Sequence, residues 1–188
     1  MAWRPTLAVT VALAVGLTMP AHTQTPGSIP KVRVIGTGGT ISGGVDPATG
    51  QSKSLTAKDL VVLVPTLTGQ VSIEEEDFTN IGSSSMTPDI QFRLARRVVD
   101  LFASRPDLAG IVITHGTDSL EETAFLVDLI VNDPRPVVFA AAQRPPRVPD
   151  SDGPRNLENA IRAAWIISRP TALLFYRAQG QGASLLFD

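Results

Sequence analysis

The chain has 188 residues, of which 43% are hydrophobic, so it is long enough for one sizeable core. Its 16 basic and 18 acidic residues give a formal net charge of −2 with no long run of either sign, which argues against a nucleic-acid partner. The absence of cysteine excludes a disulfide framework, a thiolate zinc site and a cysteine nucleophile. Covalent catalysis would have to use an oxygen or nitrogen nucleophile.

The first 24 residues have the three regions of a secretory signal. Arg4 precedes an apolar stretch at residues 7–17, and Pro20 and Ala21 lead into a small-residue region where we expect cleavage. An uncleaved anchor is the alternative, but the stretch is shorter than the roughly 20 residues that span a bilayer. We expect a periplasmic or secreted protein with no membrane contact after cleavage.

Beyond a Pro/Gly-rich linker at residues 25–30, short β-branched runs alternate with longer amphipathic segments. This alternation predicts an α/β domain over residues 31–176, a Rossmann-like or flavodoxin-like parallel sheet with helices on both faces. Strands are expected at residues 32–36, 71–75, 110–114, 136–141 and 171–176. Helices are expected at residues 56–64, 88–104, 120–131 and 153–167.

Two of these strands, at residues 110–114 and 137–141, lack polar alternation and should be central, with helices covering both faces. Ligands of such sheets bind beyond the carboxyl ends of the strands. The chemistry is therefore expected in the loops that follow the strands, at residues 37–44, 80–86, 115–119 and 142–154.

The first loop, residues 36–44, is rich in glycine, which lets the backbone turn sharply and approach a ligand closely. A dinucleotide or phosphate loop is one alternative, although the spacing matches neither fingerprint and no lysine follows the glycines. A purely structural glycine turn is another.

The third loop places His115, Thr117 and Asp118 at a strand-to-helix junction. Asp118 or Ser119 could cap the helix that follows, but capping does not explain why these three side chains come together where a substrate would bind.

Residues 37–41, Thr-Gly-Gly-Thr-Ile, and residues 115–124, His-Gly-Thr-Asp-Ser-Leu-Glu-Glu-Thr-Ala, resemble the two signature motifs of bacterial-type L-asparaginases and glutaminase-asparaginases. The resemblance extends from Lys31 to Ala164. Further matches are Asn80-Ile81-Gly82-Ser83 with Met86, Gln143-Arg144-Pro145, and Asp152-Gly153-Pro154 with Asn156-Leu157.

The resemblance implies that Thr40 is the nucleophile that attacks the side-chain amide carbon and releases ammonia from an acyl-enzyme, with Thr117 as a second catalytic threonine. A hydroxyl of high intrinsic pKa needs an activating neighbour for this chemistry. A Ser/His/Asp arrangement through His115 is a weaker alternative, because histidine in the family motif has a structural role. No cofactor is implied, and with His22 and His115 as the only histidines a histidine zinc site is not expected.

The same resemblance implies the substrate contacts. Asp118 would bind the α-ammonium and Ser83 the α-carboxylate, with Ser84 beside it, while the backbone near Ala142 would lie at the amide end. A zwitterionic amino acid needs both an anion and hydrogen-bond donors, so these residue types suit L-asparagine.

The chain departs from the family pattern in two places. Residues 45–56, at the position of the family's flexible lid, carry Lys53 but no tyrosine. The family's activating lysine and smaller C-terminal domain have no counterpart, and the tail at residues 177–188 matches nothing expected. We therefore expect a truncated or frameshifted form, or a fragment, with little activity as written.

The leading interpretation is hydrolysis of L-asparagine to L-aspartate and ammonia, with a glutaminase-asparaginase as the alternative within the family. The resemblance also implies a homotetramer. A transfer-RNA amidotransferase subunit fits less well, because the export signal would separate it from its substrate. From another class, an inactive remnant or a periplasmic small-molecule binding module stays open.

Overall fold

The computed structural model describes residues 28–45, 48–51, 53–167, 172–176 and 183–186. They form a six-stranded sheet in the order β2-β1-β3-β4-β5-β6, parallel except for β6. The strands are β1 (Lys31–Gly38), β2 (Ser72–Ile81), β3 (Leu108–Thr114), β4 (Val137–Ala140), β5 (Ala172–Tyr176) and β6 (Ala183–Leu186).

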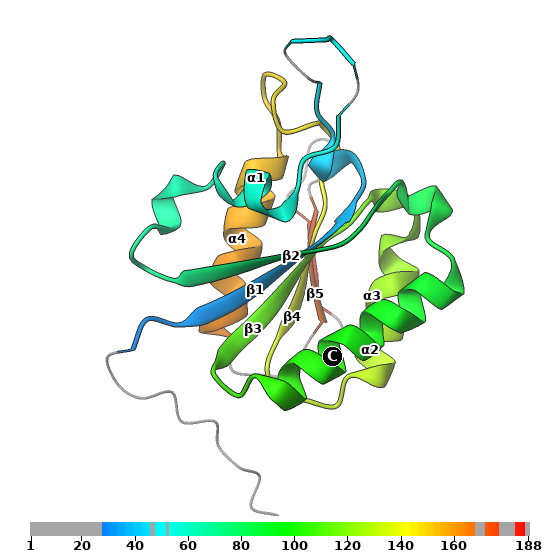
Figure 1. The fold of residues 1–188 in the computed structure, drawn as a ribbon. Helices are drawn as coiled ribbons and strands as arrows, with labels where there is room; N and C mark the ends of the chain where they lie inside the picture. Colours follow the sequence, from blue (N-terminus) through cyan, green and yellow to red (C-terminus); the bar gives the residue numbers. More distant parts are fainter. Residues whose placement is uncertain (1–27, 46–47, 52, 168–171, 177–182, 187–188) are drawn as a thin grey trace, which may run out of the picture.

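Helices cover both faces of this sheet, as the sequence predicts (Figure 1). The helices are α1 (Ala57–Val61), α2 (Pro88–Ser104), α3 (Leu120–Ile130) and α4 (Gly153–Ile166). One apolar cluster joins α1 and α4 to one face, and a second joins α2 and α3 to the other. Strands β3 and β4 are buried along their whole length, which confirms that they are central.

In the strand order β2-β1-β3-β4-β5, β2 lies on one side of β1 and the later strands lie on the other side. The order in which strands are added therefore switches between β1 and β3. In open α/β sheets of this order, ligands bind at that switch point, beyond the carboxyl ends of the strands. The loops after β1 and β4 emerge together at the carboxyl ends of the strands, at the top of Figure 1. The fold thus brings the motif loops together at the carboxyl ends of the strands.

Strand β2 is longer than its predicted residues 71–75 and runs on to Ile81. The sequence prediction was too short because Glu74, Glu76 and Asp77 are of residue types that are uncommon in strands. The fold accommodates them at the sheet edge: Glu74 pairs with Arg33 at 2.7 Å, and Asp77 accepts the N–H of Ala57 at 2.7 Å. Tertiary partners therefore override the local preference.

Helix α1 is shorter than the predicted residues 56–64. It begins with a capping box in which Thr56 and Asp59 bond each other's backbone N–H, and it ends at Val61. A separate 3₁₀ turn begins at Pro65. Proline disfavours helical geometry at the residue before it, so the helix cannot run through Val64.

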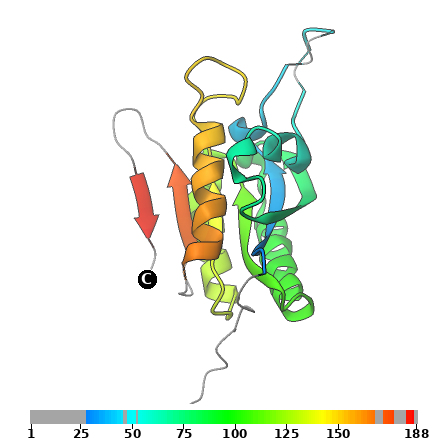
Figure 2. The same cartoon turned by 90° about the vertical axis from the view of Figure 1, so that its left-hand side faces the viewer.

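The sequence predicts a special segment at each end of the chain. The predicted signal at residues 1–24 lies outside the described residues. The predicted tail at residues 177–188 contains β6, a strand that the sequence did not reveal and that pairs antiparallel with β5 (Figure 2). No helix within the described ranges is both long and apolar enough to cross a membrane.

At the amino-terminal ends of the strands, Arg135 connects α2 to the start of β4. Its guanidinium is 7% exposed, donates to the carbonyls of Phe102, Arg105 and Leu108, and pairs with Asp133 at 2.8 Å. It also lies 4.1 Å above the Phe102 ring. These contacts satisfy the Phe102 carbonyl in the last turn of α2, which lacks a partner inside the helix, and reach the start of β3 at Leu108.

Replacing Arg135 with methionine should therefore destabilise the fold. Arg135→Met removes the charged donor to the buried carbonyls of Phe102 and Leu108 and the ion pair with Asp133, and we expect the free energy of unfolding to fall by about 3 kcal/mol. Urea denaturation measures this loss. Arg93→Met removes an exposed i,i+4 pair and should change stability by less than about 0.5 kcal/mol, so equal effects of the two variants would contradict the role of Arg135.

Candidate active site

The first motif loop leaves β1 in a tight turn. Thr37 is buried, and its hydroxyl donates to the carbonyl of Thr114 at 2.7 Å, which ties the end of β1 to β3. Gly39 then turns the chain at φ 80°, ψ −174°, a conformation that only glycine adopts readily. Thr40 begins the short 3₁₀ turn Thr40–Ser42, and Gly43 donates its N–H back to the Thr40 carbonyl at 2.9 Å. Thr40 therefore projects from a rigid turn.

The glycines of this loop serve loop packing. A Cβ on Gly39 would overlap the backbone of Gly116 in the third loop, and a Cβ on Gly116 would lie 2.5 Å from the Ser83 hydroxyl oxygen. The backbones of the first and third loops therefore meet directly, and the Ser83 side chain of the second loop packs against Gly116. A dinucleotide loop would instead lead into a long helix whose N-terminus holds the phosphates, and here only a three-residue turn follows.

Two hydrogen bonds join the second loop to the third. The hydroxyl oxygen of Ser83 accepts the backbone N–H of Asp118 at 3.0 Å, and the Ser119 hydroxyl donates to the Ser83 carbonyl at 2.8 Å. Ser119 stands at the N-cap of α3 without a side-chain capping bond, so the capping interpretation of Asp118 and Ser119 is wrong. The sequence did not reveal this role of Ser119. Ser84 follows Ser83 in the same turn and is exposed.

Thr40 and Thr117 are half-buried, and within the described chain neither hydroxyl has a hydrogen-bond partner. Asp118, next to Thr117, is exposed. Other hydroxyls of these loops are bonded within the fold, as with Thr37 and Ser119. The hydroxyls of Thr40 and Thr117 and the carboxylate of Asp118 are thus available to a ligand.

The fourth loop adjoins the first. Ala142 is 1% exposed, and a Cβ on Gly153 would lie 3.5 Å from the Ala142 Cβ and 3.6 Å from Ile41 Cγ1, next to Thr40. The carboxylate of Asp152, 8% exposed, holds the loop by accepting the backbone N–H of Gln143 at 3.0 Å. The fold thus places the Ala142 backbone beside the turn of Thr40.

His115 lies beneath these loops and is fully buried. Its Nδ1 is 2.7 Å from the Gly116 carbonyl, which can only accept, so Nδ1 carries the proton and Nε2 is unprotonated. Burial lowers the pKa of His115, opposed by the Gly116 hydrogen bond and the charge of Glu122. The ring contacts Phe139 edge-on, at 6.1 Å between centroids. The Ser/His/Asp alternative is therefore wrong, because Nδ1 is committed to the backbone and no hydroxyl reaches Nε2 in the described chain.

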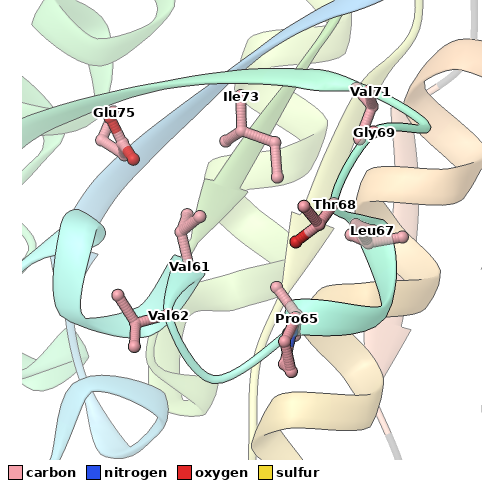
Figure 3. Close-up of a pocket in the computed structure, with 10 residues that line it drawn as sticks. Val61, Val62, Pro65, Leu67, Thr68, Gly69, Val71, Ile73 and Glu75 are labelled. Carbon is pink, nitrogen blue, oxygen red and sulfur yellow. The ribbon is translucent and has the colours of Figure 1, made fainter.

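A hollow of about 400 Å³ lies elsewhere, between α1, the turn at Pro65 and the amino-terminal half of β2 (Figure 3). Glu75 is the only charged residue of its otherwise mainly apolar lining. None of the motif residues lines it. Across the described ranges, no three His, Asp or Glu side chains cluster closely enough to hold a metal ion.

Comparisons with known proteins agree with the motifs. Residues 31–175 match the family model "Asparaginase, N-terminal". The chain is 41% identical over 140 residues to L-asparaginase 2-3 of Saccharomyces cerevisiae and 39% identical over 140 residues to L-asparaginase 2 of Escherichia coli. A crystal structure of a probable cytoplasmic L-asparaginase from Campylobacter jejuni superposes with a TM-score of 0.68 at 35% identity, covering 77% of this chain and 43% of that one.

The fold and motif loops define an asparaginase-type α/β domain. The chain belongs to the asparaginase family and contains its N-terminal domain. Each alignment with the two curated relatives covers 73% of this chain but only 38% and 39% of the relatives. The chain thus spans about two fifths of their length.

The Gly39–Gly116 contact can be tested by adding one methyl group. Gly39→Ala should lower the free energy of unfolding by at least about 3 kcal/mol, because it combines an unfavourable φ with overlap against Gly116. Gly50 also has positive φ, 69°, but nothing lies within 4 Å of an added Cβ, so Gly50→Ala should cost only about 1 kcal/mol. Comparable losses in thermal denaturation would show that the loops do not meet as described.

The buried imidazole predicts a pH dependence of stability. Because the pKa of His115 is lower in the folded state than its ordinary value of 6.5, the unfolded state binds more protons, and the free energy of unfolding should fall as pH drops below about 6.5. His115→Asn keeps a donor for the Gly116 carbonyl and should flatten this slope. The carboxylates with lowered pKa contribute only near and below their ordinary values, 3.8 for Asp59 and Asp107 and 4.5 for Glu74 and Glu158. An equal slope above pH 5 in parent and variant would contradict the assignment.

Proposed function

We propose that this domain supplies the nucleophile and the amino-acid binding loops of an L-asparagine amidohydrolase. The observation that carries the proposal is the pair of unbonded hydroxyls of Thr40 and Thr117 at the switch point of the sheet, beside the exposed carboxylate of Asp118. The relatives named L-asparaginase support asparagine as the substrate.

The proposed reaction proceeds through an acyl-enzyme. The Thr40 oxygen attacks the side-chain amide carbon, its proton passes to a neighbouring acceptor, and the amide nitrogen leaves as ammonia after taking up a proton. Water then attacks the ester carbon, which releases L-aspartate and restores the threonine. Thr117 is the second hydroxyl of this centre and bonds to the reacting groups. The backbone near Ala142 lies at the amide end.

The α-carbon end of the substrate is bound by the second and third loops. Asp118 is the counter-charge of the α-ammonium. The Ser83 oxygen already accepts the Asp118 N–H, so its own proton is available for the α-carboxylate, with Ser84 beside it. One anion and adjacent hydroxyl donors suit the zwitterion. L-glutamine, one methylene longer, is a second proposed substrate of the same site.

Release of ammonia from L-asparagine by the purified chain joined to the C-terminal domain of a relative tests the proposal, because little activity is expected of the chain as written. Thr40→Ala should lower this rate by at least about 10³-fold, because it removes the nucleophile. Asp118→Ala should raise KM about 30-fold or more while kcat falls less, because the charged partner of the α-ammonium is lost. Thr68→Ala, at the hollow near Pro65, is the matched control and should leave both constants unchanged.

The same assay separates the alternatives. Faster turnover of L-glutamine than of L-asparagine would make the protein a glutaminase-asparaginase. Binding of L-aspartate without ammonia release would support a binding module or an inactive remnant. Activity that survives Thr40→Ala would refute the nucleophile.

We further propose that the protein is exported and assembles as a homotetramer. The amino-terminal sequence pattern supports export, and family membership supports assembly. Mass spectrometry of the mature N-terminus should find cleavage near residues 21–25, and light scattering should find four subunits.

A further inference from the structure

The loops of the candidate site are connected to a buried amide in helix α2. The turns that carry Ser83 and Asp118 are joined by two hydrogen bonds, the Asp118 N–H to the Ser83 hydroxyl oxygen at 3.0 Å and the Ser119 hydroxyl to the Ser83 carbonyl at 2.8 Å. These bonds fix the relative position of the two groups proposed to bind the α-carboxylate and the α-ammonium.

The hydrogen-bond series continues away from the site. The hydroxyl of Thr123 donates to the Ser119 carbonyl at 2.8 Å, and the side-chain amide of Gln91 donates to the Thr123 hydroxyl oxygen at 2.9 Å. Thr123 is fully buried and Gln91 is 8% exposed. The series therefore runs from Gln91 through Thr123 and Ser119 to Ser83.

Two features indicate that Gln91 does more than occupy space in the hydrophobic core. It stands on the face of α2 that otherwise buries Leu94, Ala95 and Val98, where an aliphatic side chain would be cheaper to bury. A threonine hydroxyl bonded to the carbonyl four residues earlier is common in helices, but a second bond from another helix sets its orientation. In a buried setting such bonds are strong, and losing a partner is costly.

We propose that Gln91 is a positioning residue. It acts through Thr123 and Ser119 to hold Ser83 and Asp118 in the relative positions that the α-carboxylate and α-ammonium groups of the amino acid require. Gln91 touches neither the substrate nor the reacting atoms. The inference rests on the proposed function, because it assigns the α-carbon end of the ligand to Ser83 and Asp118.

The test compares L-aspartate and D-aspartate, which carry the same groups in opposite arrangement at the α-carbon. By calorimetry, Gln91→Leu should weaken L-aspartate binding about three- to tenfold and reduce the preference for the L-enantiomer. Gln70→Leu is the control, because Gln70 is exposed and bonds Thr66 and Arg162 far from these loops. A residue that only stabilises the core would leave the enantiomer preference of the folded protein unchanged.

A second pair of variants covers the case in which Gln91→Leu does not fold. Thr123→Val removes the hydroxyl at nearly constant volume and should reproduce the effect, while Thr123→Ser keeps the hydroxyl and should restore the parent preference. If both residues act through one series, the double variant Gln91→Leu/Thr123→Val should be no weaker in binding than the weaker single variant.

Hydrogen exchange of the ligand-free protein provides an independent measurement. The Asp118 amide should exchange faster in Gln91→Leu and Thr123→Val, while the Gly43 amide, bonded to the Thr40 carbonyl at 2.9 Å, should keep its protection. Parent-like enantiomer preference and exchange in both variants would overturn the inference. If the parent does not bind L-aspartate, the proposed function fails and the ligand part of the inference with it, while the exchange result still decides the hydrogen-bond series.

Discussion

The backbones of the loops after β1 and β3 touch at Gly39 and Gly116, and the placement of the candidate site depends on that contact. Adjacent parallel strands bring their following loops side by side, but ordinary side chains would hold the loops apart. Two glycines remove that barrier, and Ser83 closes on the same point from the second loop. Thr40, Thr117 and Asp118 follow directly in the chain, so their positions are set by the rigid backbone beneath them.

The two ends of the parallel strands are stabilised by different interactions. At the amino-terminal ends, called the amino edge, ion pairs form a network of Lys31, Asp107, Arg105, Glu74 and Arg33, whereas the carboxyl edge is the end where the motif loops lie. These pairings lower the pKa of the Asp107 and Glu74 carboxyls, with hydrogen bonds from Arg105 as the largest cause in each case. At the carboxyl edge, the loops are held mainly by neutral hydrogen bonds and backbone contact.

This division suits the chemistry proposed for the carboxyl edge. His115 beneath the loops is kept neutral by burial, so it adds no positive charge near the exposed carboxylate of Asp118. Asp152 anchors the fourth loop through backbone N–H groups, and its charge is used within that loop. The carboxylate of Asp118 is therefore available to a cationic α-ammonium group.

Much of the fold could be read from local patterns. The predicted helix at residues 88–104 agrees with α2 at both ends, because Thr87 caps it, Pro88 opens it and an apolar stripe runs along one face. The predictions were less accurate where long-range partners decide. The acidic residues of β2 form a strand because Arg33, Arg97 and Arg105 neutralise them, and β6 exists because β5 offers an open edge.

The strand ends indicated only which loops would carry polar groups, and the candidate residues were identified through the resemblance of two sequence motifs to the asparaginase family. The sequence by itself therefore determined the α/β class, the family and the candidate residues. Only the tertiary structure decided that Ser119 bonds Ser83 instead of capping α3, and that Gln91 on the buried face of α2 reaches Thr123. A polar residue on an apolar helical stripe signals a buried partner, but the partner comes from a distant element, so no local pattern can name it.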